Sequence, residues 1–299
     1  MNILSINPSL RIWRLAITGL VCLSILSSCT MKSLYLQLDW LIPQFIEEYI
    51  PLDDKQAQQL KLNLQKTLYW HRSTQLPEYI RWLKLLKKEI NQGLKRDQVM
   101  QHTWQLEQFW KTLLNYIAED SATLLFSTRQ EQRDQLFKNF QKQNSKYQKK
   151  HIEPDAETLR HNLVTQISDE FERWLGYLEP AQRELIDKAT KKMKPMGQLH
   201  LDNRLILQNR LKFLLDTTTS PEKFKVEIKE LFSHWENLYT KEYQDAINYN
   251  KAILINLVVE IALTLSDEQQ KYLFHKIDYY INIFNELLIK NNLQIKYYE

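Results

Sequence analysis

The chain has 299 residues, of which 40 are lysine or arginine and 36 are aspartate or glutamate, so its formal net charge is +4. A charge this close to neutral does not by itself indicate a polyanionic partner. With two cysteines and four glycines, the chain has neither a disulfide framework nor a glycine-rich phosphate loop.

The first element is an apolar run from Leu15 to Leu26, which follows Arg11 and Arg14. A basic start, an apolar stretch of about 7–15 residues and small residues after it are typical of an export signal, whereas a membrane span needs about 20 apolar residues. The run ends at Leu26-Ser27-Ser28-Cys29, which resembles the lipobox of bacterial lipoproteins.

This resemblance implies that residues 1–28 are a signal peptide and that Cys29 is acylated, with palmitate or a similar fatty acid, as the new N-terminus. Two or more acyl chains hold a protein on a bilayer. By the same resemblance, Thr30 in place of an aspartate implies sorting to the outer membrane, with residues 29–299 facing the periplasm. An ordinary signal peptide and an uncleaved anchor are the alternatives.

After the signal, apolar residues recur every three or four positions, as between Thr103 and Ile117. This periodicity predicts an all-α fold, an array of about ten amphipathic helices that follow the N-terminal signal helix. A subdivision is possible near residues 151–154. The expected helices cover residues 53–74, 78–92, 95–119, 121–150, 155–175, 180–194, 199–216, 221–247, 248–264 and 267–291.

Three of these helices begin with a leucine followed four residues later by a glutamine, namely Gln56, Gln182 and Gln269. The residue three positions before each glutamine can cap the helix while the glutamine side chain reaches back, as in a capping box. These segments are similar to the Leu-Thr-x-x-Gln motif of Spy/CpxP-type periplasmic chaperones. The similarity implies a chaperone or stress factor, and plain helix starts are the alternative.

A wider resemblance rests on Leu38-Asp39-Trp40-Leu41-Ile42-Pro43, on Leu52-Asp53-Asp54 and on Trp70-His71-Arg72 before Leu76-Pro77. These motifs look like an uncharacterised family of all-helical Gram-negative lipoproteins. That family has no established activity. The resemblance therefore implies a location in the cell envelope and a helical fold, but no catalytic residue.

Four residues of these motifs, Asp39, Trp40, Trp70 and His71, form a candidate polar and aromatic cluster. Aromatic rings with one polar edge line recognition clefts as well as cores. In the alternative interpretation the rings pack the first helices together, and Asp39 and His71 could form a buried polar pair.

A row of lysines follows between Asp134 and Glu153, where the sequence has no acidic residue. Its members are Lys138, Lys142, Lys146, Lys149 and Lys150, with Phe137, Phe140 and Tyr147 interleaved. The spacing predicts a positive helix face for an anionic lipid or glycan, or else a solvated face. Nucleic acid is not an expected partner in the periplasm.

The segment from Ala252 to Leu265 is the most apolar one after the signal, but its length and the polar Asn256 and Glu260 indicate a core helix rather than a span. If Glu260 faced a cavity, with Tyr272 and Phe274 nearby, a small-molecule role would gain support.

The sequence contains no paired Glu-x-x-His elements, no His-Glu-x-x-His zinc motif, no Gly-x-Ser-x-Gly nucleophile elbow and no glycine-rich phosphate loop. We therefore expect no catalytic residue, cofactor or metal ligand. The expected function is non-catalytic binding or scaffolding of envelope components. Envelope proteins are candidate partners, besides the anionic lipid or glycan named above. A Spy/CpxP-like chaperone and an envelope enzyme with an unrecognised motif are the alternatives.

Overall fold

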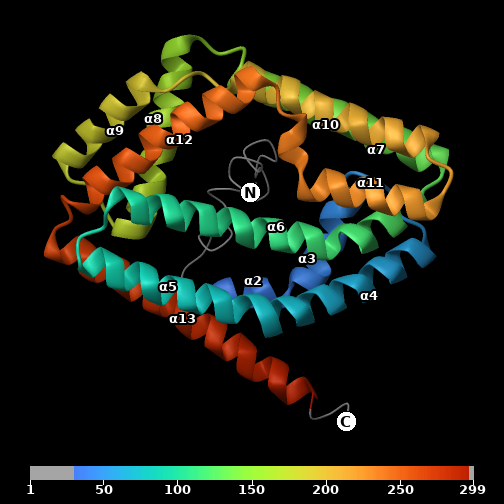
Figure 1. Ribbon diagram of the computed structural model, residues 1–299, viewed down its shortest axis with the longest axis horizontal. Helices are drawn as coiled ribbons and strands as arrows, with labels where there is room; N and C mark the ends of the chain where they lie inside the picture. The colour runs from blue at the N-terminus through green and yellow to red at the C-terminus, as the bar shows by residue number, and fades with distance from the viewer. Residues whose placement is uncertain (1–29, 296–299) are drawn as a thin grey trace, which may run out of the picture. The chain divides into compact units, whose positions relative to one another are not determined.

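The computed structural model describes residues 30–295, and every regular element within this range is helical, as predicted (Figure 1). In chain order these are α2 (Thr30–Leu36), α3 (Leu38–Glu47), α4 (Asp54–Trp70), a π-helix η2 (His71–Gln75), α5 (Leu76–Asn91), α6 (Arg96–Phe126), α7 (Gln130–His151), α8 (Ala156–Leu175), α9 (Pro180–Lys192), α10 (Gly197–Thr217), α11 (Pro221–Ser233), a short 3₁₀ helix η3 (Trp235–Leu238), α12 (Lys241–Ala262) and α13 (Asp267–Ile295). The all-α prediction is confirmed.

Three of the predicted helix breaks are wrong. The break expected at residues 75–77 does not occur, since the π-helix η2 passes directly into α5. The chain turns at residues 127–129 rather than near residue 120, because the hydroxyls of Ser127 and Thr128 bond the carbonyls of Leu124 and Leu125 and so satisfy the end of α6. A second break falls at residues 234–240 rather than near residue 248. There the Trp235 indole donates to the Tyr239 hydroxyl at 2.9 Å, a side-chain contact that apolar periodicity does not reveal.

Two glycines end helices with a positive φ, Gly93 after α5 (87°) and Gly176 after α8 (85°). This conformation is open to glycine and costly for residues with a Cβ. The turns from α5 to α6 and from α8 to α9 therefore depend on glycine, although the chain has so few.

The described residues divide into two compact units, each made of three separate segments. Unit 1 comprises residues 30–71, Leu106–Lys150 and Gly197–Thr240, and unit 2 comprises Arg72–Gln105, His151–Met196 and residues 241–295. The chain passes from one unit to the other five times. One of these passages is between Lys150 and His151, next to the subdivision that the sequence suggested near residues 151–154.

Each unit has its own apolar core. In unit 1, Ala122 of α6 packs with Leu214 and Leu215 of α10 and with Phe224 and Ile228 of α11.

The core of unit 2 includes Leu94, Val99 and Ile255, with Val258 and Val259 packed against them. Also in unit 2, α5 and α13 lie side by side (Figure 1). The segment that was predicted to be a core helix, α12, carries Ile255, Leu257 and Ile261 as buried residues, as expected.

Within residues 30–295, no single helix has both the length and the apolar content needed to cross a bilayer. The stretch from Lys241 to Leu288 meets both conditions only as two helices, α12 and α13, with a bend of 116° between them.

Candidate functional site

The export signal and Cys29 lie outside the described residues, so the predicted lipidation site has no structural description. The described chain begins at Thr30, the first residue of α2. α2 and α3 both belong to unit 1.

The four residues of the predicted polar and aromatic cluster fall into two environments. Asp39 and Trp40 are exposed on α3, and Trp40 retains 57% of its accessible surface. Trp70 and His71 are half-buried at the end of α4. The prediction of a buried Asp39–His71 pair is therefore wrong, and so is the alternative that Trp40 packs in the core.

His71 is instead bonded to Tyr35, whose hydroxyl lies 2.9 Å from Nδ1 of the imidazole. Tyr35 is buried on α2, which brings the first helix of the described chain onto the end of α4. The Trp70 ring stacks on Tyr116 of α6, with ring centroids 3.8 Å apart and planes 6° from parallel. Trp70 and His71 thus join helices of unit 1 by packing.

The predicted helix starts have a further property that the capping signature alone did not indicate. In unit 2, Gln182 and Gln269 are both fully buried and bond each other reciprocally: Nε2 of Gln182 donates to Oε1 of Gln269 at 3.0 Å, and Nε2 of Gln269 donates to Oε1 of Gln182 at 2.8 Å. Each Oε1 also accepts the backbone N–H three residues earlier, from Glu179 and from Ser266.

In this unit 2 pair, each glutamine amide also donates to a backbone carbonyl that lies just before the helix of the other glutamine. Nε2 of Gln182 donates to the carbonyl of Thr264, and Nε2 of Gln269 donates to the carbonyl of Tyr177. Each carbonyl lies five residues before the other glutamine. The two side chains therefore satisfy each other and both turns, as buried amides require.

Unit 1 contains an equivalent pair, Gln56 and Gln132, which also bond each other reciprocally, at 3.3 and 2.7 Å. Gln56 accepts from the N–H of Asp53 and donates to the carbonyl of Ser127, five residues before Gln132. Gln132 accepts from the N–H of Arg129 and donates to the carbonyl of Pro51, five residues before Gln56. The same hydrogen-bond pattern therefore occurs once in each unit.

Sequence reasoning missed Gln132, because Thr128 occupies the place that leucine takes in the other three segments. No sequence spacing would have identified it as the partner of Gln56, because the two pairs are separated by different intervals, 76 and 87 residues. The glutamines are thus more than individual helix caps.

Asp53 caps α4 and carries a further charge contact in unit 1. Its carboxylate accepts the backbone N–H of Gln56 at 3.0 Å and pairs with Arg129 at 2.6 Å. The N–H of Gln56 and then the Arg129 guanidinium hold the pKa of Asp53 below its usual value.

The predicted lysine row lies on the outer side of α7, where all five lysines are exposed. Among residues 30–295, none of the five is in an ion pair. The aromatic residues interleaved with the lysines in the sequence do not share their face, because Tyr147 is buried, Phe137 and Phe140 are half-buried, and these rings contact other parts of unit 1.

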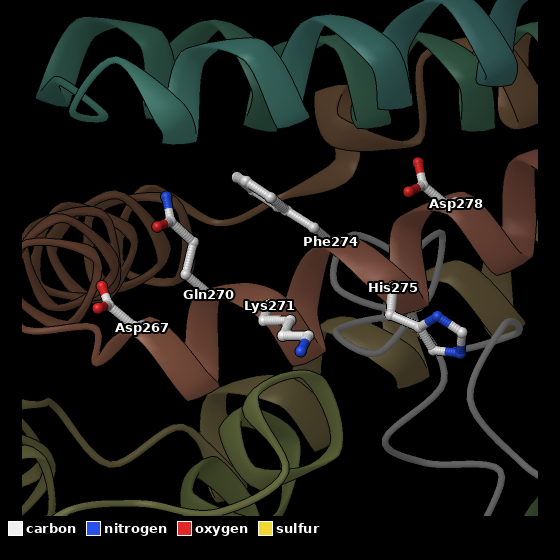
Figure 2. Close-up of a pocket in the computed structure, with 6 residues that line it drawn as sticks. All are labelled: Asp267, Gln270, Lys271, Phe274, His275 and Asp278. Atoms are coloured by element: carbon white, nitrogen blue, oxygen red, sulfur yellow. The ribbon is translucent and has the colours of Figure 1, made fainter.

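An open hollow of about 540 Å³ lies along α13 of unit 2 (Figure 2). It is lined by Asp267, Gln270, Lys271, Phe274, His275 and Asp278. Phe274 and Asp278 point toward α5, whereas Lys271 and His275 point away from it (Figure 2). On α5, Lys87 bonds both oxygens of Asp278, at 2.7 and 2.6 Å, and lies 5.3 Å from the centre of the Phe274 ring.

All six residues that line this hollow come from one helix, α13. The Asp278 carboxylate is already neutralised by Lys87. An enzyme site requires titratable groups that converge in an enclosed space. The hollow on α13 does not have that arrangement.

The possibility that Glu260 faces a cavity is wrong, because Glu260 is exposed on α12. Its neighbour Asn256 accepts a hydrogen bond from Nε of Arg96 at 3.0 Å. Residues 30–295 contain no cluster of three or more histidine, cysteine, aspartate or glutamate side chains that could hold a metal ion.

Comparison with known families matches residues 48–244 to DUF6279, a family of unknown function. The chain belongs to this family. The matched range includes the lysine row of α7 and three of the four paired glutamines, whereas Asp39, Trp40 and Gln269 lie outside it. No curated protein and no solved structure matches the chain. The prediction of an uncharacterised family is confirmed, and the DUF6279 match assigns no role to any residue.

Proposed function

We propose that this DUF6279 chain is a lipoprotein anchored in the outer membrane through Cys29, faces the periplasm, and binds or scaffolds envelope components without catalysis. The observation that carries the proposal is the sequence Leu26-Ser27-Ser28-Cys29 directly after a basic and apolar export signal. Diacylated chains stay on a bilayer, so such an anchor fixes where the protein acts.

The surface of the described helices supports a binding role. The lysine row on α7 presents five exposed cations without an ion-pair partner among residues 30–295, which is a surface that can take an anionic partner. The hollow on α13 lacks the enclosed arrangement of titratable groups that a reaction needs, which favours binding over catalysis for the surfaces described above.

The test is expression of the full chain in a Gram-negative cell as wild type, as Cys29→Ala and as Cys22→Ala. Cys22 is the matched control, because it lies inside the apolar run and lacks the lipobox context. After membrane fractionation, the intact mass of the mature protein is measured. We expect wild type and Cys22→Ala to begin at residue 29, to carry acyl mass and to be in the outer membrane, and Cys29→Ala to carry none.

Unacylated, freely periplasmic protein in all three cases would contradict the proposal. A soluble Spy/CpxP-like chaperone would then be the better hypothesis. The support for this alternative is the similarity of the Leu-x-x-x-Gln segments to the Leu-Thr-x-x-Gln motif of those chaperones.

A further inference from the structure

The exposed face of α7 differs in its charge balance from the other helices. On several other helices, lysines are paired with an acid one turn away, as in Lys188–Glu184, Lys191–Asp187 and Lys241–Asp245. On α7 the five lysines lie between Asp134 and Glu153 with no acid between them. Like charges one turn apart repel by about 0.2–0.5 kcal/mol per pair, so an anionic partner would relieve this repulsion.

The opposite face of α7 is held in place, which fixes the lysines toward solvent. Nδ2 of Asn144 donates to Oε1 of Gln208 on α10 at 2.8 Å, and the Tyr147 ring lies 5.3 Å from the His200 ring. In Figure 1, α7 and α10 run side by side. These contacts oppose rotation of α7 about its own axis. The five lysines therefore stay on the side that faces solvent.

The chemistry of this face selects among anionic partners. The aromatic rings of α7 face the packed side, so the lysines are accompanied outside by polar residues such as Gln141, Ser145 and Gln148. Proteins that bind single-stranded nucleic acid stack the bases on exposed aromatic rings, which this face lacks. Lysine ammonium groups without aromatic rings fit phosphate and other small anionic groups.

The length of the row indicates an extended partner. From Lys138 to Lys150 the helix advances about 18 Å at 1.5 Å per residue. A single small anion cannot contact the whole row, whereas the headgroups of an anionic bilayer can.

The N-terminal segment connects this face to the proposed anchor. Nδ2 of Asn139, next to Lys138, donates to the carbonyls of Glu48 and Tyr49, at 3.1 and 2.9 Å. Residues 30–48 are mostly helical, and 18 steps at 1.5 Å per residue correspond to about 27 Å. The lysine face and the residue after Cys29 thus belong to one compact unit.

We propose that the exposed lysine face of α7 is a second membrane contact, which binds the anionic, phosphate-bearing headgroups of the bilayer. The inference rests on the proposed lipid anchor for its place in the cell, but headgroup binding by the face itself does not require acylation. Anchored proteins commonly combine a lipid with a basic patch, because the two contributions add.

The experiment uses unacylated residues 30–299, which contain all the helices of the described range, and vesicles of 30% phosphatidylglycerol in phosphatidylcholine. Sedimentation gives the partition coefficient. The test variant replaces Lys138, Lys142, Lys146, Lys149 and Lys150 with glutamine. The matched control replaces Lys55, Lys61, Lys84, Lys229 and Lys271, five exposed lysines on other helices, with glutamine, so both variants lose five positive charges.

Each lysine near an anionic surface contributes about fivefold to the partition coefficient. We expect the test variant to lose at least about 100-fold and the control variant less than about fivefold. Binding of the wild type should fall as salt rises and should be absent on pure phosphatidylcholine. Far-UV circular dichroism verifies that both variants keep their helices, since glutamine and lysine have similar helix propensities.

Equal losses in the two variants would overturn the proposal, because net charge rather than the α7 face would then govern binding. Unchanged binding of the test variant would also overturn it. If the wild type ignores the vesicles but binds soluble dextran sulfate through the α7 lysines, the partner is an anionic glycan and the membrane proposal is wrong. These results are independent of whether Cys29 is acylated in cells.

Discussion

Tyr147 is 5% exposed on the packed side of α7, and burial raises the pKa of its phenol to about 12. In the unfolded chain the pKa is 10.0, so between these values the unfolded state loses the proton while the folded state keeps it. The free energy of unfolding should therefore fall as pH rises above 10. At pH 11.5 the loss due to Tyr147 is about 2 kcal/mol.

Replacing Tyr147 with phenylalanine should remove this loss, whatever the variant's stability at neutral pH. The measurement is urea unfolding at pH 9 and at pH 11.5, and the quantity compared is the difference between the two pH values within each variant. Phe140→Leu serves as control, because it alters packing on the same helix without removing an ionisable group. The same difference in wild type and Tyr147→Phe would show that Tyr147 does not titrate as we expect.

At the residue scale, the sequence predicted exposure of the lysines better than burial of the aromatic residues. Charged side chains stay in water wherever a helix lies, so the α7 lysines could be placed from spacing alone. Trp40 fits an apolar pattern in the sequence but is exposed, and Trp70 is held by Tyr116, which is 46 positions away in the chain. Periodicity identifies an apolar face but not the element that covers it.

At the element scale, the reciprocal glutamines should be coupled energetically. Gln182→Ala removes one hydrogen bond that the buried Gln269 amide donates, one that it accepts, and the donor to the carbonyl of Thr264. We expect a loss of about 1–3 kcal/mol in the free energy of unfolding. Gln269→Ala should cost a similar amount. The double variant should cost less than the sum, with an interaction energy of about 0.5–3 kcal/mol, because the bonds between the two amides are lost with the first substitution and cannot be lost again with the second.

A urea-denaturation double-mutant cycle measures this coupling. Gln198→Ala is the matched control, since Gln198 is exposed and donates to Asp202 on its own helix. It should change the free energy of unfolding by less than about 0.5 kcal/mol. Strict additivity of Gln182→Ala and Gln269→Ala would mean that the two glutamines act only as separate caps.

The helix starts were the most predictable part of the fold because their signals are local. Gln56, Gln182 and Gln269 bond backbone groups only three residues away, so a short sequence motif contains both partners. Their second bonds cross to another helix, and nothing in the sequence near Gln182 identifies Gln269 as its partner. The helix ends at Phe126 and Ser233 were mispredicted for the related reason that side-chain hydroxyls and an indole, not glycine or proline, stop them.

At the scale of the whole molecule, the chain forms two units from six alternating segments, an arrangement that helical periodicity does not encode. Each unit nevertheless contains one glutamine pair and one apolar core. The pairs correspond position by position, down to the carbonyls five residues before each glutamine. This correspondence indicates that the same arrangement of hydrogen bonds, a reciprocal glutamine pair between two helix starts, stabilises both units.

If each pair stabilises its own unit, then removing a pair should loosen that unit alone. Gln56→Ala should raise amide hydrogen exchange in α4 and α7, and Gln269→Ala should raise it in α9 and α13. Local opening of a compact unit requires loss of its own buried contacts, so amides of the other unit should keep wild-type exchange rates within about twofold. Hydrogen exchange read by mass spectrometry on peptides from each segment measures this, with Gln198→Ala as the control. Equal acceleration in both units by either variant would mean that the two units open as one cooperative body, in which case the glutamine pairs stabilise the entire molecule.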